Sequence, residues 1–238
     1  MSTKGEGDRG EAVRRFAPSR VISMTADRSR PRMIRRVAPL PPLPSRADTM
    51  GMALTHRRFT VDEYHRMAEV GVFEEDDRVE LLDGEIVEMT PIGDRHVACV
   101  VRLNDLLSRR SVEPLVSVQN PLVLASRSEP QPDIVVLPRQ ADHSAAWLPR
   151  GADALLVIEV ADTSVDHDRD VKIPLYAVAG IPEVWLVDLP AELIEVYQDP
   201  EAGRYTTRRI VARGASLSPR RLPQVTLAAD EILGPRAR

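Results

Sequence analysis

The sequence predicts a domain of mixed α/β (α+β) class, in which helices flank a mixed β-sheet. Helical and strand-like segments alternate along residues 60–212, and the strand-like segments are short apolar runs separated by turns rich in Pro and Gly. Of the 238 residues, 43% are hydrophobic and 29% are charged, so the chain has enough apolar material to bury a core. At roughly 100 to 200 residues a domain, this length allows one sizeable domain with an extension.

The first 49 residues differ in character from the rest of the chain. They carry ten Arg and one Lys against five acidic residues, a net charge of +6, which leaves −10 for the remainder of a chain whose total is −4. They show no apolar periodicity, so we expect residues 1–51 to be a disordered Arg/Pro-rich extension and residues 52–238 to form the folded domain. Three interpretations of the extension stay open: dispensable sequence upstream of a start at Met50 or Met52, a basic arm for nucleic acid, and a transit peptide.

The folded part begins with a helix, a hairpin and a second helix. Thr60-Val-Asp-Glu63 matches a capping box, in which each end residue's side chain bonds the other's backbone amide, and it predicts a helix over 60–70. Asp83-Gly84 suits the positive φ angles of a tight turn, so residues 78–89 predict a β-hairpin. Residues 94–110 predict a helix on the sheet, with one face traced by Val97, Val100, Val101, Leu103, Asn104 and Leu107.

The later elements are strands and one more helix. Residues 166–179 have helical apolar spacing and end at Gly180 with Pro182 beyond, which is a usual end of a helix. Residues 183–188 are almost continuously apolar and predict a central strand. The other predicted strands cover residues 115–118, 122–125, 133–137, 154–160, 192–197 and 206–212, and only a weak terminal segment is predicted after them.

The composition excludes several kinds of site. The single cysteine, Cys99, excludes an internal disulfide and a multi-thiolate metal site and is typical of a reducing compartment, so we expect a cytoplasmic protein. No apolar run approaches the roughly 18 residues that cross a bilayer, so we expect no membrane partner. The five histidines show no metal-ligand spacing, and we interpret His96 as an ordinary helix histidine.

Three carboxylates occupy positions that suggest chemistry. Asp133 stands at the mouth of an apolar strand directly after Pro132, and Glu159 lies near the end of another apolar strand. A carboxylate in such surroundings loses solvation, so it must be protonated, paired or bound to a cation. Glu80 begins the first strand of the hairpin, and its spacing leaves open both an outward-facing residue and a site residue.

Lys172 is the only lysine of the folded part, because the other one, Lys4, lies in the extension and the chain otherwise uses 30 Arg. A surface charge alone would be expected to be Arg here, so a lysine indicates a specific role. An ammonium is a compact charge that can orient a water or meet a developing oxyanion. Carboxylates that hold Mg²⁺ or Mn²⁺ beside such a lysine are one solution for phosphodiester hydrolysis.

Five short stretches carry these residues and their surroundings. They are Phe59–Tyr64, Val79–Glu88, Gln131–Val136, Leu156–Val160 and Asp168–Asp188. In this order they resemble the PD-(D/E)XK nuclease superfamily, and more closely its Uma-type branch of restriction endonuclease-like proteins. The resemblance implies a restriction endonuclease-like fold in which Asp133 and Glu159 bind a divalent metal, Glu80 is an additional acid at that metal and Lys172 is catalytic.

The chain departs from the general superfamily pattern in one respect. The lysine of that pattern stands two residues after the second acid, where this chain has Ala161. Lys172, four residues before Tyr176, is similar to the lysine that the Uma-type branch places on the following helix. Pro174 removes an amide donor within that helix and is harmless only near its first turn. We interpret Tyr176 and Trp185 as core residues.

The leading hypothesis is a metal-dependent endonuclease, with DNA as the substrate that the resemblance implies. The alternative is a catalytically inactive nuclease-fold module for binding or assembly, and a third hypothesis is hydrolysis of another phosphoester. The resemblance also suggests a homodimer, since a duplex needs two cuts. The charge of −10 opposes phosphate binding unless Arg residues cluster, and Arg109-Arg110 and Arg208-Arg209 are candidates. A single cleft containing all four site residues would favour the nuclease.

Overall fold

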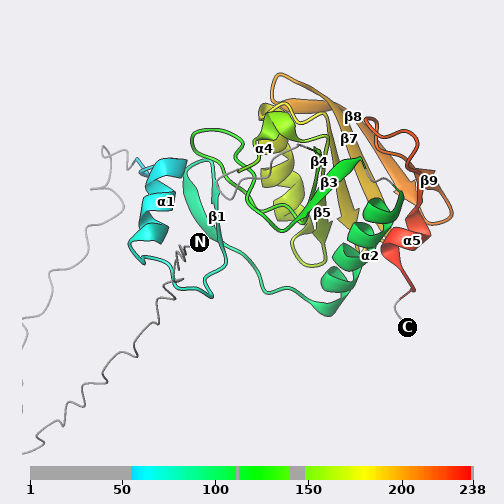
Figure 1. Cartoon of the computed structure of the whole chain (residues 1–238), viewed down its shortest axis with the longest axis horizontal. Helices are drawn as coiled ribbons and strands as arrows, with labels where there is room; N and C mark the ends of the chain where they lie inside the picture. Colours follow the sequence, from blue (N-terminus) through cyan, green and yellow to red (C-terminus); the bar gives the residue numbers. More distant parts are fainter. Residues whose placement is uncertain (1–54, 111–112, 140–147, 237–238) are drawn as a thin grey trace, which may run out of the picture. The chain divides into compact units, whose positions relative to one another are not determined.

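A six-stranded mixed sheet forms the centre of the domain (Figure 1). The computed structural model describes residues 55–110, 113–139 and 148–236, so the expectation for residues 1–51 lies outside the described residues. The strands run in the order β3-β4-β5-β6-β7-β8, and all neighbours are antiparallel except β5 and β6, which are parallel. Their bounds are Pro114–Val118 (β3), Ile134–Pro138 (β4), Leu156–Ala161 (β5), Glu183–Asp188 (β6), Leu193–Glu201 (β7) and Arg204–Ala212 (β8).

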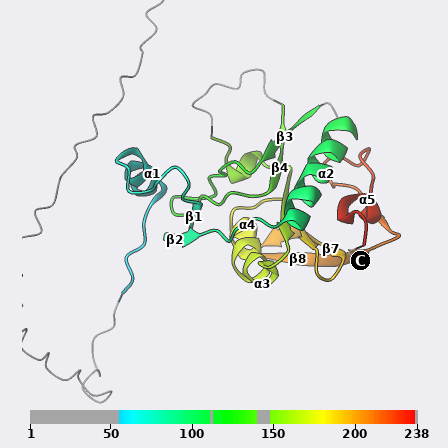
Figure 2. The ribbon, with the colours of Figure 1, turned by 90° about the horizontal axis from the view of Figure 1, so that it is seen from below.

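Helices cover both faces of this sheet, as predicted for the fold class. On one face, α2 (Asp94–Arg110) and α5 (Ala229–Leu233) pack against residues such as Ile158. On the other face, α4 (Ile173–Val178) packs against residues such as Val157. The two sets alternate along β5 because successive strand side chains point to opposite faces. Figures 1 and 2 show α2 and α5 together on one side of the sheet and α4 on the other.

A separate hairpin lies beside the main sheet, next to the first helix, α1 (Val61–Glu69) (Figure 2). The hairpin consists of β1 (Val79–Leu82) and β2 (Glu85–Glu88), joined by a two-residue turn. Asp83 and Gly84 in this turn have φ angles of 45° and 79°, which confirms the predicted tight turn. The capping box that begins α1 is also present.

The crossover from β5 to β6 is helical, but the type of helix changes along it. It consists of α3 (Val165–His167), one π turn (Asp168–Lys172) and then α4. The predicted helix over 166–179 is thus confirmed, except that Lys172 ends a π turn instead of lying in a first helical turn. Pro174 is in the first residues of α4, where its missing amide is tolerated.

Three sequence predictions differ from the structure. Residues 122–125 form isolated bridges in a loop that folds back on itself, with the Leu124 amide bonded to the Ser128 carbonyl, and they are not a strand. Val97 and Val101 of α2 are 48% and 61% exposed, because Cys99 and its helical neighbours face the core in their place. The C-terminal region, predicted only as a weak segment, forms β9 (Ser216–Leu217), β10 (Leu227–Ala228) and α5.

Within the described part of the chain, no helix is long and apolar enough to cross a membrane.

Candidate active site

Asp133 and Glu159 meet where β4 and β5 separate. The antiparallel ladder between these strands ends at the pair Ile134 and Ile158, so Asp133 and Glu159 are the next two residues outward. Beyond this pair, the Asp133 side chain replaces a backbone acceptor, since its Oδ2 accepts a hydrogen bond from the Val160 amide at 2.8 Å. The Asp133 amide in turn lies 3.4 Å from Oε2 of Glu159. The strand register therefore places the two acidic residues opposite each other at the end of the ladder.

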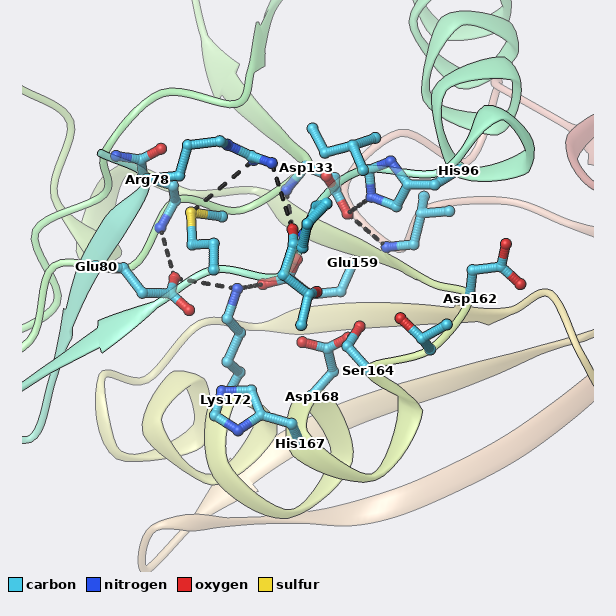
Figure 3. Close-up of a pocket in the computed structure, with 18 of the residues that line it drawn as sticks. Arg78, Glu80, His96, Asp133, Glu159, Asp162, Ser164, His167, Asp168 and Lys172 are labelled. Atoms are coloured by element: carbon cyan, nitrogen blue, oxygen red, sulfur yellow. Dashed lines mark hydrogen bonds and ion pairs between the residues drawn. The ribbon is translucent and has the colours of Figure 1, made fainter. Parts of the chain in front are cut away.

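Lys172 joins Glu159 to the hairpin (Figure 3). Its Nζ lies 3.1 Å from Oε2 of Glu80 and 3.3 Å from Oε1 of Glu159. Oε2 of Glu80 also accepts the backbone amide of Gln131 at 3.2 Å. All three charged residues are buried, with at most 5% of their surface exposed. Glu80 thus points inward, toward the cluster, and the open choice between an outward and an inward position is resolved.

Burial and ion pairing set the protonation of this cluster. Burial favours the protonated form of Glu159 and raises its pKa, whereas the adjacent Lys172 charge favours the carboxylate and lowers it. Burial alone would lower the pKa of Lys172, but the carboxylates of Glu159 and Glu80 raise it above its ordinary value. Burial also raises the pKa of Asp168, which accepts the Ser164 hydroxyl. Lys172 is therefore an ammonium at neutral pH and acts as a hydrogen-bond donor, not as a base.

Three further side chains contact the two strand carboxylates. His96 of α2 places Nε2 3.0 Å from Oδ2 of Asp133, and Gln119 donates its side-chain amide to Oδ1 at 3.2 Å. The Tyr176 hydroxyl donates to Oε1 of Glu159. Tyr176 is fully buried in the core, as predicted, but its hydroxyl also contacts the site residue Glu159. The interpretation of His96 as an ordinary helix histidine is wrong, because His96 contacts Asp133.

Two residues of the site that the sequence analysis missed could have been found from their spacing in the chain. Asp168, Lys172 and Tyr176 follow each other at intervals of four residues, which places them near one side of a helical segment. That spacing would have identified Asp168 and Tyr176 as neighbours of Lys172. His96 and Gln119 carry no such signal, because their partner Asp133 lies 37 and 14 residues away in the chain.

All four predicted site residues line one cavity of about 380 Å³. The cavity is markedly acidic, since six carboxylates line it against two permanent cations, Arg78 and Lys172. The six are Glu80, Glu88, Asp133, Glu159, Asp162 and Asp168. An anionic substrate would be repelled here unless a further cation were bound.

The side chains present suit a metal with few protein ligands. Within residues 55–110, 113–139 and 148–236, no group of three or more His, Cys, Asp or Glu is arranged to hold a metal ion. Asp133 and Glu159 nevertheless bring two acidic side chains to the same cavity, and Mg²⁺ commonly takes one or two carboxylates together with waters and substrate phosphates. The pair therefore fits such an ion. Glu80 bonds Lys172 here, and its predicted role as a metal ligand stays a prediction.

Comparison with known proteins shows which proteins resemble the chain. The Uma2 family model, described as "Putative restriction endonuclease", matches residues 61–230. The crystal structure of a "putative nuclease belonging to DUF820" from Anabaena variabilis is similar with a TM-score of 0.58 and 18% identity, covering 74% of this chain and 97% of that chain. The type IIG restriction endonuclease BpuSI is 19% identical, with a TM-score of 0.33, over 50% of this chain and 14% of its own. No curated protein matches the chain.

The family match and the likeness to the Anabaena protein agree with the fold and with the sequence resemblance. The likeness to the Anabaena protein concerns the fold, a mixed α+β architecture of the restriction endonuclease-like kind. The family match extends from the first residue of α1 into α5 and includes Glu80, Asp133, Glu159 and Lys172. The chain therefore belongs to the Uma2 family, whose members are described as putative restriction endonucleases.

Proposed function

We propose that the protein is a divalent-metal-dependent endonuclease that hydrolyses phosphodiester bonds of DNA. The observation that carries this proposal is the convergence of Asp133, Glu159, Glu80 and Lys172 on one cavity. These residues come from four separate segments of the chain. A binding module that had lost its chemistry would have no need to bury an ammonium among carboxylates at the end of a strand ladder.

Asp133 and Glu159 would hold Mg²⁺ or Mn²⁺, with Glu80 as the auxiliary acid. A bound ion of this kind lowers the pKa of a water molecule and neutralises charge on a phosphate. The acidic cavity supports this assignment, because six carboxylates leave a phosphate no favourable position without an added cation.

Lys172 would orient the attacking water or stabilise negative charge on the phosphate. An ammonium has three N–H donors, and Glu80 and Glu159 occupy two of them. Among the described residues, no further hydrogen-bond or ion-pair partner of Nζ is present, so the third donor is available to a water or a phosphate oxygen. The raised pKa keeps the group charged through the neutral range.

The family description supports DNA as the substrate class. In the two Arg pairs considered as phosphate-binding patches, Arg109, Arg110 and Arg208 pair with Asp105, Glu231 and Glu195, so among the described residues only Arg209 has no ion pair. We therefore expect DNA binding to depend strongly on the divalent ion. A homodimer, which would place two such sites on one duplex, belongs to the same proposal.

The test is cleavage of supercoiled plasmid and of single-stranded DNA by the full chain, with Mg²⁺, Mn²⁺ or EDTA. We expect metal-dependent nicking that is lost with EDTA and in Asp133→Asn and Lys172→Met. Asp62→Asn is the matched control, because Asp62 is exposed on α1 and does not line the cavity, so this variant should cut like the wild type. A wild-type protein that neither binds Mn²⁺ nor cuts DNA would overturn the proposal.

One observation favours the second candidate, a noncatalytic nuclease-fold module. Lys172 already satisfies two carboxylates, and no three-ligand metal group is present in the described ranges, so the cluster can be read as a closed structural ion-pair network. Such a module would stay folded and could bind DNA, but it would show no metal dependence. Isothermal titration with Mn²⁺ separates the two candidates, since only the nuclease needs a saturable site that Asp133→Asn removes.

A further inference from the structure

The hydrogen bonds of Asp133 leave one side of its carboxylate free. An ionised carboxylate offers about four acceptor positions, two on each oxygen. Oδ2 uses both of its positions, for the Val160 amide at 2.8 Å and for His96 Nε2 at 3.0 Å. Oδ1 uses one, for the Gln119 amide at 3.2 Å. The remaining acceptor position of Asp133 is therefore on Oδ1.

We propose that His96 is a positioning residue that orients Asp133 for metal binding, an inference that rests on the proposed function. His96 lines the same cavity, and its side chain is 14% exposed. Because an ionised Asp133 can only accept, Nε2 carries the proton in this hydrogen bond. This hydrogen bond occupies Oδ2 and prevents the carboxylate from rotating. Oδ1 therefore stays available to the metal ion. Figure 3 shows the imidazole reaching Asp133 from α2.

The other nitrogen of His96 argues against a purely structural role. Nδ1 is buried and has no hydrogen-bond partner within the described part of the chain. A buried unsatisfied polar atom costs stability, and native structures tolerate few of them, often at functional sites. Cys99, Val100 and Leu103 already anchor this part of α2 in the core, so the helix does not depend on the histidine for its position. The Nε2 hydrogen bond to Asp133 is the interaction that explains a histidine at this position.

A second histidine in the domain provides a matched control. His65 Nε2 lies 2.9 Å and 2.8 Å from the two oxygens of Glu129, a buried carboxylate, so it makes the same kind of contact. Neither His65 nor Glu129 lines the cavity. Loss of the His65 contact should affect stability alone, whereas loss of the His96 contact should also affect the metal.

The test measures Mn²⁺ affinity by isothermal titration for three substitutions of His96 in the full chain. His96→Gln places an amide nitrogen as many bonds from Cβ as Nε2, and His96→Asn places one as many bonds away as Nδ1. Outer residues that orient metal ligands typically contribute 10-fold to 100-fold in affinity. We expect His96→Leu and His96→Asn to lose about that much and His96→Gln to stay within about threefold of the wild type. His65→Leu should bind Mn²⁺ like the wild type.

The outcomes separate the inference from the function on which it rests. Asp133→Asn, measured in parallel, should abolish Mn²⁺ binding. If it does, and the Gln and Asn variants of His96 bind equally well, the positioning role is wrong while the nuclease site stands. If the wild type binds no Mn²⁺, both proposals are overturned. The Gln and Asn variants differ by one methylene, so a difference between them in affinity, at equal melting temperature, is not explained by misfolding.

Discussion

Lys172 is a buried charge whose cost is offset by its two partners. Transfer of an unpaired ammonium into a protein interior costs several kcal/mol, and the interaction with nearby carboxylates returns much of it. Glu80 and Glu159 supply this interaction at 3.1 Å and 3.3 Å. Arg would not substitute readily, because a planar guanidinium needs more room than the 5% exposed Lys172 has between the two acids. This explains why an Arg-rich chain retains one Lys in this domain.

The coupling between Glu80 and Lys172 can be measured with a double-mutant cycle. We expect Glu80→Gln and Lys172→Met each to lower the free energy of unfolding by about 3 kcal/mol, since the first removes one of the two carboxylates that pair with Lys172 and the second leaves both carboxylates without their cation. The double variant should lose less than the sum, with a coupling energy of about 2 kcal/mol in urea denaturation. Arg57 and Glu63 form a more exposed pair, and the same cycle there should give a clearly smaller coupling energy. A coupling near zero between Glu80 and Lys172 would contradict this account.

At the scale of elements, the hairpin turn determines where Glu80 lies. Gly84 in this turn has a φ of +79°, which L side chains rarely adopt. It also packs closely against the segment before α1, since an added Cβ would lie 2.7 Å from Cβ of Arg58 and 3.0 Å from the Phe59 carbonyl oxygen. The turn thus closes the hairpin and docks it on the chain that leads into α1.

Gly84→Ala should therefore destabilise the protein by more than backbone strain alone. Gly214 also has a positive φ, of +82°, but an added Cβ there meets nothing within 4 Å, so Gly214→Ala measures the strain, about 1 kcal/mol. We expect Gly84→Ala to lose at least about 1 kcal/mol more in urea denaturation, because the Arg58 and Phe59 backbone must move. Equal losses in the two variants would show that the close contact is unimportant.

The helical crossover is the second element that shapes the site. The π turn Asp168–Lys172 carries two of its ionisable side chains, and the α4 turn that follows carries Tyr176. Short π turns inside helices are frequent at functional sites. In this protein the turn lets Lys172 face the carboxylates while α4 keeps Ile173 and Tyr176 in the core.

At the scale of the whole molecule, an ion-pair network ties this crossover to the far strands of the sheet. Glu195 of β7 is buried and pairs with Arg169 of the π turn and with Arg208 of β8, each at 2.8 Å. Burial would raise the pKa of Glu195, but hydrogen bonds from Arg169 and Tyr197 and the charge of Arg208 lower it below its ordinary value. The network therefore depends on an ionised Glu195.

This network should make the stability of the fold sensitive to acid. A carboxylate whose pKa is lower in the folded than in the unfolded protein stabilises the fold fully above the unfolded pKa, near 4.5, and this contribution is lost as the pH falls through the folded pKa. At pH 7 we expect Glu195→Gln to lower the free energy of unfolding by about 2 kcal/mol, and the difference from the wild type should shrink below about pH 4.5. Glu192→Gln, at a more exposed pair, should differ from the wild type by clearly less than Glu195→Gln does. Urea denaturation across pH 3–7 measures both, and a difference independent of pH would contradict the assignment.

Much of the fold could be predicted from the sequence because its signals are local. The capping box at Thr60, the Asp83-Gly84 turn and the apolar run of β6 each depend on residues close together in the chain. The failures arose where distant contacts override the local pattern. Residues 122–125 have strand-like composition but fold back through backbone bonds to Ser128, and Val97 and Val101 fit a helical apolar face that the sheet leaves exposed.

In the candidate site, too, the sequence predicts the individual residues, whereas their contacts depend on distant parts of the chain. Asp133, Glu159 and Lys172 stand out as candidate site residues in the sequence, because carboxylates in apolar strands and a lone lysine among 30 Arg are visible without coordinates, and the family resemblance adds Glu80. The three-dimensional fold was needed to see that Asp133 lies opposite Glu159, that Lys172 bridges Glu159 and Glu80, and that His96 and Tyr176 contact the two strand acids. These contacts join residues up to 92 positions apart, and strand register and helix packing set them, which local periodicity in the chain does not encode.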